Sequence, residues 1–132
     1  IVLASIVERE AVKPEERPLI AAVFLGRLDR GMMLQADPTV SYAKGFDLDL
    51  GRWWPPMAVE DAEAIDSPYN TFQYRGLPPG PICSPGLGAI QGVAQPERTD
   101  FLYFVSRGDG THAFAVTYEE HLQNVAKFNS LQ

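Results

Sequence analysis

The sequence lacks the residues that internal disulfides and metal clusters require. It has a single cysteine, Cys83, and no pair of cysteines at metal-binding spacing. The two histidines, His112 and His121, stand apart in the chain. Structural zinc sites and disulfide frameworks both need several such residues close together. We therefore predict no metal site and no cofactor.

Long apolar runs and a surplus of basic residues are also missing. No stretch of about 18 apolar residues could span a membrane, and no leader peptide is visible. Basic residues number 11 against 17 acidic ones, which gives a net charge of -6. A nucleic-acid binder needs clustered basic residues to neutralise phosphates, so nucleic acid is excluded as a partner.

What the chain does contain is enough apolar material for one globular domain. Its 132 residues are 45% hydrophobic and 11% aromatic. At this length a folded chain buries roughly two thirds of the surface that its unfolded form exposes. The first residue is Ile1 and not methionine, and it falls inside an expected helix. We expect residues 1–132 to be a single domain taken from a longer protein.

Periodicity and turn residues predict an α+β domain that is mainly helical. Helices are expected over residues 1–12, 14–30, 57–65, 86–94 and 117–128. A β-hairpin is expected from residues 101–107 and 112–116, joined by Gly108-Asp109-Gly110. Residues 32–56 are expected to be irregular, with a short strand near 33–35.

Local signals mark where several of these segments begin or turn. Asp37-Pro38 predicts a turn. Ser84-Pro85 predicts a helix start, because a hydroxyl residue before proline is a common opening. Thr117 and Glu120 form a capping box for the last helix. Residues 67–84 form a long loop rich in proline and glycine, and loops of this length often carry function.

Two glutamates on the first expected helix, Glu8 and Glu10, are candidates for acid chemistry. They lie about 200° apart around a helix, so they face opposite sides and cannot work as a pair. Each has apolar neighbours, and burial raises the pKa of a carboxyl toward the range that a general acid needs. The alternative is an ion pair with an arginine such as Arg9, Arg17 or Arg27. The residues alone do not decide between these possibilities.

Two polar segments are candidates for binding a sugar. Gln35, Asp37, Thr39 and Tyr42 suit hydrogen bonding to a sugar, but Asp37 equally suits capping of a local turn. Tyr69-Asn70-Thr71, with Phe72 and Tyr74, combines aromatic faces with amide and hydroxyl groups, which carbohydrate binding uses, although loop packing explains it as well. The adjacent Trp53 and Trp54 are a further candidate platform, with the character of loop anchors.

A cysteine peptidase or amidase is a weaker hypothesis. Cys83 precedes an expected helix start, where the pKa of a thiol is lowered, and His112 could serve as its base. A lone cysteine and a histidine on a hairpin are more often structural.

Four segments of the chain, in order, resemble the YceG-like (MltG-like) endolytic murein transglycosylases. They are LASIVEREA (3–11), FLGRLDRGMMLQADPTVSYAKG (24–45), SPYNTFQYRGLPPGPICSPG (67–86) and FLYFVSRGDGTHAFAVTYEEH (101–121). One such segment would say little, but four in the same order cover nearly the whole chain. Cys83 and residues 51–65 depart from the family pattern, and we expect the latter to form a variable rim of the cleft.

The resemblance implies a catalytic domain similar in general character to lysozyme, and it implies roles for particular residues. Glu8 corresponds to the catalytic acid of the family, and Glu10 to a second acid with a structural or supporting role. The residues that it implies for substrate binding are Gln35, Asp37, Thr39, Tyr69, Asn70 and Thr71.

The implied activity is non-hydrolytic cleavage of the MurNAc–GlcNAc β-1,4 bond of peptidoglycan, which leaves 1,6-anhydroMurNAc ends. One carboxyl acts first as acid and then as base, and the acetamido group of the substrate replaces a second carboxylate. The alternatives are a hydrolytic muramidase that uses Asp37 or Asp100 as its second carboxylate, and a peptidoglycan-binding module without activity.

The resemblance also implies partners and a location. The expected partners are the glycan strands of peptidoglycan and the glycan polymerases of wall synthesis. Full-length members of the family have a membrane anchor and a LysM-like subdomain before the catalytic region. We therefore expect the longer protein to work at the extracytoplasmic face of the bacterial inner (plasma) membrane.

Overall fold

The computed structural model of the chain describes residues 1–129. The elements in order are α1 (Val2–Glu10), η1 (Pro14–Glu16), α2 (Arg17–Asp29), α3 (Asp37–Lys44), α4 (Asp61–Ala64), α5 (Leu87–Ala94), β1 (Tyr103–Ser106), β2 (His112–Ala115) and α6 (Tyr118–Asn129). The prediction of an α+β domain with one hairpin is confirmed. Within the described part, no helix has the length and apolar character needed to cross a membrane.

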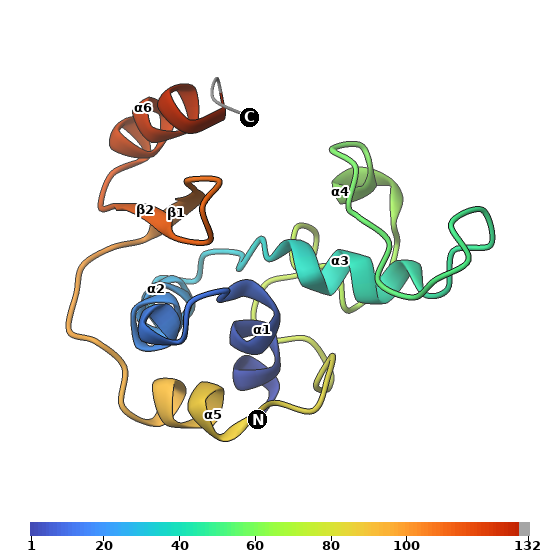
Figure 1. Cartoon of the computed structure of the whole chain (residues 1–132), viewed down its shortest axis with the longest axis horizontal. Coiled ribbons are helices and arrows are strands. Elements are labelled where there is room, and N and C mark those ends of the chain that lie inside the picture. The colour runs from blue at the N-terminus through green and yellow to red at the C-terminus, as the bar shows by residue number, and fades with distance from the viewer. Residues whose placement is uncertain (130–132) are drawn as a thin grey trace.

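Helix α1 lies at the centre of the fold, packed against α2, α3 and α5 (Figure 1). Leu3, Ile6 and Val7 are buried on it, as the nearly all-round apolar pattern predicts. Ile20 and Phe24 of α2 pack into the same core. Burial of a large apolar side chain contributes roughly 1.5–3 kcal/mol, so this core holds the end of α1 firmly in place.

The chain after α2 is more regular than its sequence suggests. The predicted strand near residues 33–35 is wrong, because Gln35 has a left-handed backbone (φ 51) that cannot continue a strand. The predicted turn at Asp37-Pro38 is also wrong, since both residues lie in the first turn of α3. Proline fits there because its missing N–H has no partner in a first helical turn.

The other helix predictions hold with changed boundaries. Helix α4 is much shorter than the predicted segment 57–65. Helix α5 is present, but Gly86 and not Ser84 is its N-cap residue. The predicted capping box is confirmed in one of its two bonds, because the hydroxyl of Thr117 accepts the N–H of Glu120 at 3.2 Å. The Glu120 carboxylate accepts the N–H of Val116 in place of that of Thr117. The segment 67–84 contains no helix or strand, as predicted.

The hairpin is tied to the helical core by two polar contacts. Strands β1 and β2 pair antiparallel, with Phe104 opposite Phe114. The Glu16 carboxylate accepts the backbone N–H of His112 at 3.1 Å and lies 2.8 Å from the Nδ1 atom of its ring. Arg27 of α2 donates from Nε to the carbonyl of Leu102 at 2.7 Å. The hairpin is therefore held beside the ends of α1 and α2.

Helices α2 and α5 come into close contact at Gly92. A Cβ atom built there would lie 3.2 Å from main-chain atoms of Arg17 and Pro18. Contacts this short with backbone are rare, and the start of α2 has little room to move. Glycine at this position lets the two helices approach each other.

We predict that Gly92→Ala lowers the free energy of unfolding by about 1–2 kcal/mol, because the clash outweighs the better helix propensity of alanine. Urea denaturation followed by circular dichroism measures the change. Gln91→Ala is the control, since Gln91 is exposed on the same helix and its substitution should change stability by less than about 0.5 kcal/mol. Equal stability of Gly92→Ala and wild type would contradict the prediction.

Candidate active site

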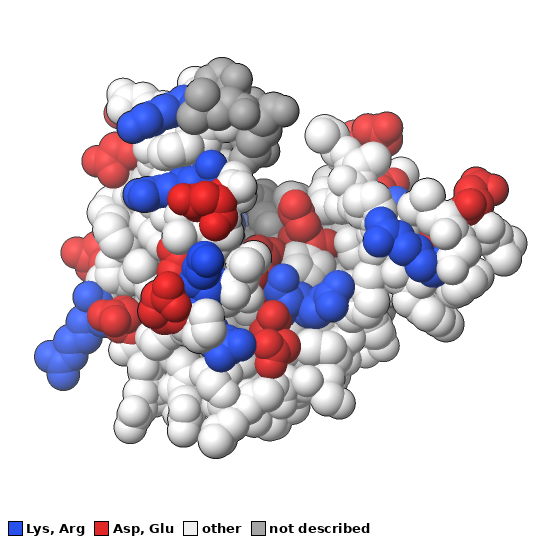
Figure 2. Space-filling view, in the orientation of Figure 1, with Lys and Arg blue, Asp and Glu red and all other residues white. Residues whose placement is uncertain are grey.

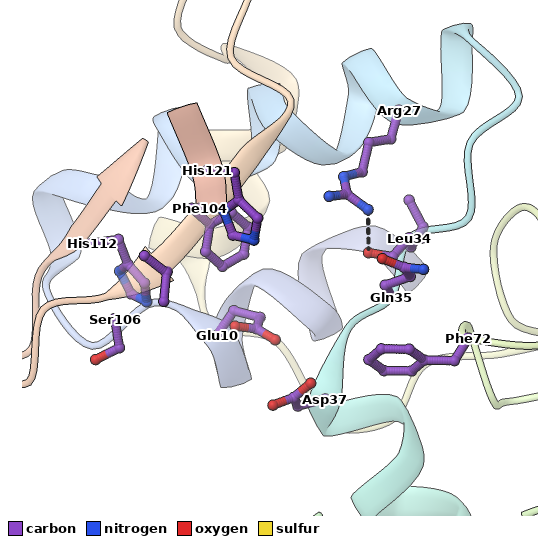
Figure 3. Close-up of a pocket in the computed structure, with 11 residues that line it drawn as sticks. Glu10, Arg27, Leu34, Gln35, Asp37, Phe72, Phe104, Ser106, His112 and His121 are labelled. Atoms are coloured by element: carbon purple, nitrogen blue, oxygen red, sulfur yellow. Dashed lines mark hydrogen bonds between the residues drawn. The ribbon is translucent and has the colours of Figure 1, made fainter. Parts of the chain in front are cut away.

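A pocket of about 400 Å³ lies where the end of α1, the start of α3 and the hairpin meet (Figure 3). We call it the acid pocket. Its polar lining residues are Glu10, Arg27, Gln35, Asp37, Ser106, His112 and His121. Figure 2 shows a hollow in this region of the molecule, with acidic atoms at its floor. The pocket is therefore open to solvent while its floor belongs to the core.

Two carboxyl groups from separate helices point into the acid pocket. Glu10 comes from the last turn of α1 and Asp37 from the first turn of α3, and Figure 3 shows them facing the same space. Burial raises the pKa of Glu10 from 4.5 to about 8, and the negative charge of Asp37 adds to this rise. Burial also raises the pKa of Asp37. At neutral pH, Glu10 therefore keeps its proton and can donate it.

Glu8 faces the other side of α1, as the helix geometry predicts. Its Oε1 atom accepts the N–H of Gly86 at 2.6 Å, and its Oε2 atom lies 3.5 Å from Nη2 of Arg17. Glu8 does not line the acid pocket. These contacts match the ion-pair alternative and join α1 to the starts of α2 and α5. Catalysis by Glu8 stays a prediction that its surroundings do not favour.

Among the residues predicted to bind substrate, Gln35 and Asp37 line the acid pocket. The left-handed backbone of Gln35 is held by a hydrogen bond from its N–H to the carbonyl of Thr71 at 3.2 Å. Asp37 lies in the first turn of α3, and the N-cap residue of that helix is Ala36. Gln35 and Asp37 therefore both stand where a ligand in the pocket would lie.

Thr39, Asn70 and Thr71 are buried and support the pocket wall from behind. The hydroxyls of Thr39 and Thr71 lie 2.9 Å apart, and the Thr71 hydroxyl accepts the N–H of Ala36 at 2.9 Å. Asn70 donates from Nδ2 to the carbonyls of Ala62 and Ile65. These bonds fix the loop 67–84 against α3 and α4. Direct contact of these three residues with substrate stays a prediction without geometric support.

Tyr69 lies in a different pocket from Glu10. It lines a space of about 410 Å³ together with Tyr42, Trp53 and Trp54. Its ring centroid is 4.9 Å from that of Tyr42. We call this space the aromatic pocket.

Several lining residues of the acid pocket were not predicted as binding residues. They are Arg27, Phe104, Ser106, His112 and His121, whereas Phe72 belongs to the predicted sugar-binding segment. The Nδ1 atom of His121 is buried and has no hydrogen-bond partner within residues 1–129, and its ring lies against Tyr103 with centroids 5.2 Å apart. Phe104, Ser106 and His112 belong to the hairpin, and its placement beside α1 depends on contacts far apart in the chain.

The chemistry that this donor set offers is proton transfer. Among residues 1–129, no three histidine, cysteine or acidic side chains are grouped so as to hold a metal ion. Cys83 donates to the carbonyl of Ser5, and burial raises the pKa of its thiol, which disfavours the thiolate that a cysteine peptidase needs. A protonated carboxyl beside a second acid remains as the reactive feature of the fold.

Glu10 and Asp37 come from separate helices and face one cleft, an arrangement that glycosidases commonly use. Residues 1–127 match the model of the YceG-like family, and the chain belongs to that family. It is 40% identical over 130 residues to the endolytic murein transglycosylase of Bacillus subtilis (strain 168), covering 98% of this chain and 34% of that protein.

Two further relatives agree with this assignment. An endolytic murein transglycosylase of Streptococcus pneumoniae is 41% identical over 131 residues, which cover 96% of this chain and 23% of that protein. A crystal structure of a YceG-like protein from Listeria monocytogenes superposes with a TM-score of 0.79 at 41% identity, covering 92% of this chain and 37% of that one. The chain thus spans about a third or less of the length of the curated relatives that it matches.

The raised pKa of Glu10 predicts how stability depends on pH. Between pH 4.5 and about 8 the folded chain holds more protons on Glu10 than the unfolded chain, so its free energy of unfolding falls as pH rises through this window. Glutamine has no proton to lose. Glu10→Gln should therefore gain thermal stability relative to wild type on going from about pH 5 to about pH 8.5.

Melting temperatures from circular dichroism at both pH values measure this effect. Glu8→Gln is the matched control on the same helix, and it should show no such gain because Glu8 is paired with Arg17. A difference between Glu10→Gln and wild type that does not change with pH would contradict the prediction.

Proposed function

We propose that this chain is the catalytic domain of an endolytic murein transglycosylase in which Glu10 is the general acid. The observation that carries the proposal is the acid pocket, where Glu10 has a pKa of about 8 and faces Asp37. The printed names of the relatives from Bacillus subtilis and Streptococcus pneumoniae support the reaction and its substrate, the glycan strands of murein.

In the proposed first step, Glu10 donates its proton to the glycosidic oxygen that leaves C1 of MurNAc. The bond from C1 to that oxygen breaks, and positive charge develops at C1. The acetamido oxygen of the same sugar supports this charge, so no protein nucleophile is required. Asp37, on the other helix, adds negative charge to the same space.

In the second step, Glu10 has become a carboxylate and takes the proton of the C6 hydroxyl. The C6 oxygen then attacks C1 and closes the 1,6-anhydro ring, without consuming water. Burial and the charge of Asp37 disfavour the ionised form of Glu10, so they make it a stronger base for this step. The raised pKa thus keeps Glu10 protonated before the first transfer and strengthens its carboxylate as the base of the second. Intramolecular attack also gains from proximity.

A hydrolytic muramidase is the second candidate, and the position of Asp37 is the observation that favours it. Hydrolases of this kind use two carboxyls that flank the scissile bond, and Glu10 and Asp37 approach the acid pocket from separate helices. In that reaction Asp37 would be the nucleophile or the base for water.

The proposed substrate bears on the location. Murein lies outside the plasma membrane, which supports the proposal of an extracytoplasmic location. The membrane anchor and the glycan polymerases as partners stay predictions.

We predict that Glu10→Gln lowers the rate of cleavage of peptide-free glycan strands by about 10²–10⁴-fold, because the amide cannot donate a catalytic proton. Glu8→Gln should stay within a few-fold of wild type, since a glutamine oxygen still accepts the N–H of Gly86. Release of soluble fragments measures both rates. The opposite pattern, with Glu8→Gln inactive and Glu10→Gln active, would return the catalytic role to Glu8.

The masses of the new chain ends separate the two candidate reactions. A transglycosylase gives 1,6-anhydro ends that are one water lighter than the reducing ends of a hydrolase. We expect anhydro ends and no incorporation of oxygen from isotopically labelled water. Reducing ends that carry labelled oxygen would establish the hydrolytic reaction instead.

A further inference from the structure

The acid pocket and the aromatic pocket are linked by a third, smaller space. This middle pocket has a volume of about 240 Å³. It shares Glu10 and Asp37 with the acid pocket, and Ser41 and Trp54 with the aromatic pocket. The three spaces therefore adjoin one another in a row, with the two acids near one end and aromatic rings at the other.

Helix α3 runs beside this row of pockets. Asp37 at its start lines the acid and middle pockets, Ser41 lines the middle and aromatic pockets, and Gly45 after its end lines the aromatic pocket. Residues spaced by four lie on one face of a helix, so one face of α3 forms the continuous wall. A helix of this length extends about 12 Å, which is longer than one sugar ring.

The aromatic pocket has the chemistry of a sugar subsite. Trp53 is 66% exposed and Tyr42 is 40% exposed, so part of each side chain is accessible to a ligand. The Tyr42 ring also packs beside the rings of Trp54 and Tyr69. The hydroxyls of Ser41 and Ser67 lie in the same lining. CH groups of a sugar pack on ring faces, and hydroxyl groups of the lining bond its polar edge. A loop anchor would bury its rings, and Trp53 does not.

The rings are also held in position before any ligand binds. The guanidinium of Arg9, next to Glu10 on α1, lies 3.8 Å from the centroid of the Trp54 ring. Trp54 has a left-handed backbone (φ 60), which is unfavourable for a bulky residue and persists only where the surroundings require it. Lys44 bonds Asp61 at 2.7 Å and so ties the segment after the tryptophans to α3.

We propose that the aromatic pocket is a second sugar-binding subsite, which holds a unit of the same glycan strand beyond the one beside Glu10. This inference rests on the proposed function, because the strand is its ligand. Trp53 is the specificity-determining residue of the subsite. Trp53 lies outside the acid pocket, so we expect the subsite to adjust strand selection and not the reaction.

Binding of purified, peptide-free glycan oligosaccharides of increasing length tests the subsite. The Glu10→Gln protein is used, so that the ligand is not cut, and calorimetry measures the dissociation constants. We expect affinity to rise once the oligosaccharide is long enough to reach the aromatic pocket. Adding Trp53→Ala should weaken binding of long oligosaccharides about five- to tenfold and leave binding of the shortest ones unchanged. Trp53→Phe should restore most of the loss.

One control variant and one second measurement accompany this experiment. Leu48→Ala removes an apolar side chain that is 88% exposed in the same region but lines none of the three pockets, so it should change no dissociation constant. The sequence has two tryptophans, and both line the aromatic pocket. Intrinsic fluorescence should therefore change with long oligosaccharides more than with short ones.

The outcomes separate the subsite from the proposed reaction. Suppose that wild type cuts murein, but adding Trp53→Ala to Glu10→Gln either leaves the dissociation constants unchanged or weakens binding of all lengths equally. The subsite is then rejected and the proposed reaction stands. If wild type produces no new chain ends but the length-dependent loss is seen, the subsite stands and the proposed reaction is rejected. If the Glu10→Gln protein binds no oligosaccharide of any length, the proposed subsite is rejected.

Discussion

The hydrogen bond between the buried hydroxyls of Thr39 and Thr71, 2.9 Å long, fixes where α3 begins relative to the loop 67–84. The Thr71 hydroxyl also accepts the N–H of Ala36, the residue just before the helix. Asp37 follows directly, so its carboxyl faces Glu10 because the threonine pair holds the backbone behind it. Leaving any of these groups unpaired in the core would cost about 1–3 kcal/mol. The geometry of the acid pocket thus depends on bonds that never contact a ligand.

Helix α1 uses its two glutamates in opposite ways, and the difference comes from what packs on each side. Glu8 meets a backbone N–H and Arg17, which suit an ionised carboxylate. Glu10 is buried and faces a second acid, Asp37. Both conditions disfavour its ionised form and raise its pKa to about 8. One short helix therefore carries a structural tie on one face and a carboxyl with a raised pKa on the other.

The sequence predicts the elements of this fold better than it predicts the site. Periodicity locates α1, α2, α5 and the hairpin, because their apolar patterns are local. Helix α3 escapes prediction since Asp37-Pro38 suits a turn and a first helical turn equally well. The family motif marks the segment that contains both glutamates, but choosing between them requires knowing which partners arrive from α3 and α5. Those partners lie far away in the chain.

The polar motifs of the long loop are a second case in which residue type does not identify the site. Asn70 and Thr71 have the residue types that bind sugars, yet both are buried and bond the backbone. A motif can therefore mark a loop that must keep its shape, and not the atoms that touch substrate. Tyr69, next to them, faces the aromatic pocket instead. Residue type alone does not distinguish these three neighbours.

Chemistry and strand selection occupy different parts of the chain, and this separation has a physical basis. The acid pocket is built from α1, α3 and the hairpin, whose positions are fixed by the core and by buried hydrogen bonds. Trp53 and Trp54 belong to an exposed segment that reaches the core through a few contacts, such as Arg9 on Trp54 and Lys44 on Asp61. Substitutions in that segment alter the far end of the groove while Glu10 and Asp37 keep their places. A fold arranged in this way can change the strands that it selects without rebuilding the groups that transfer the proton.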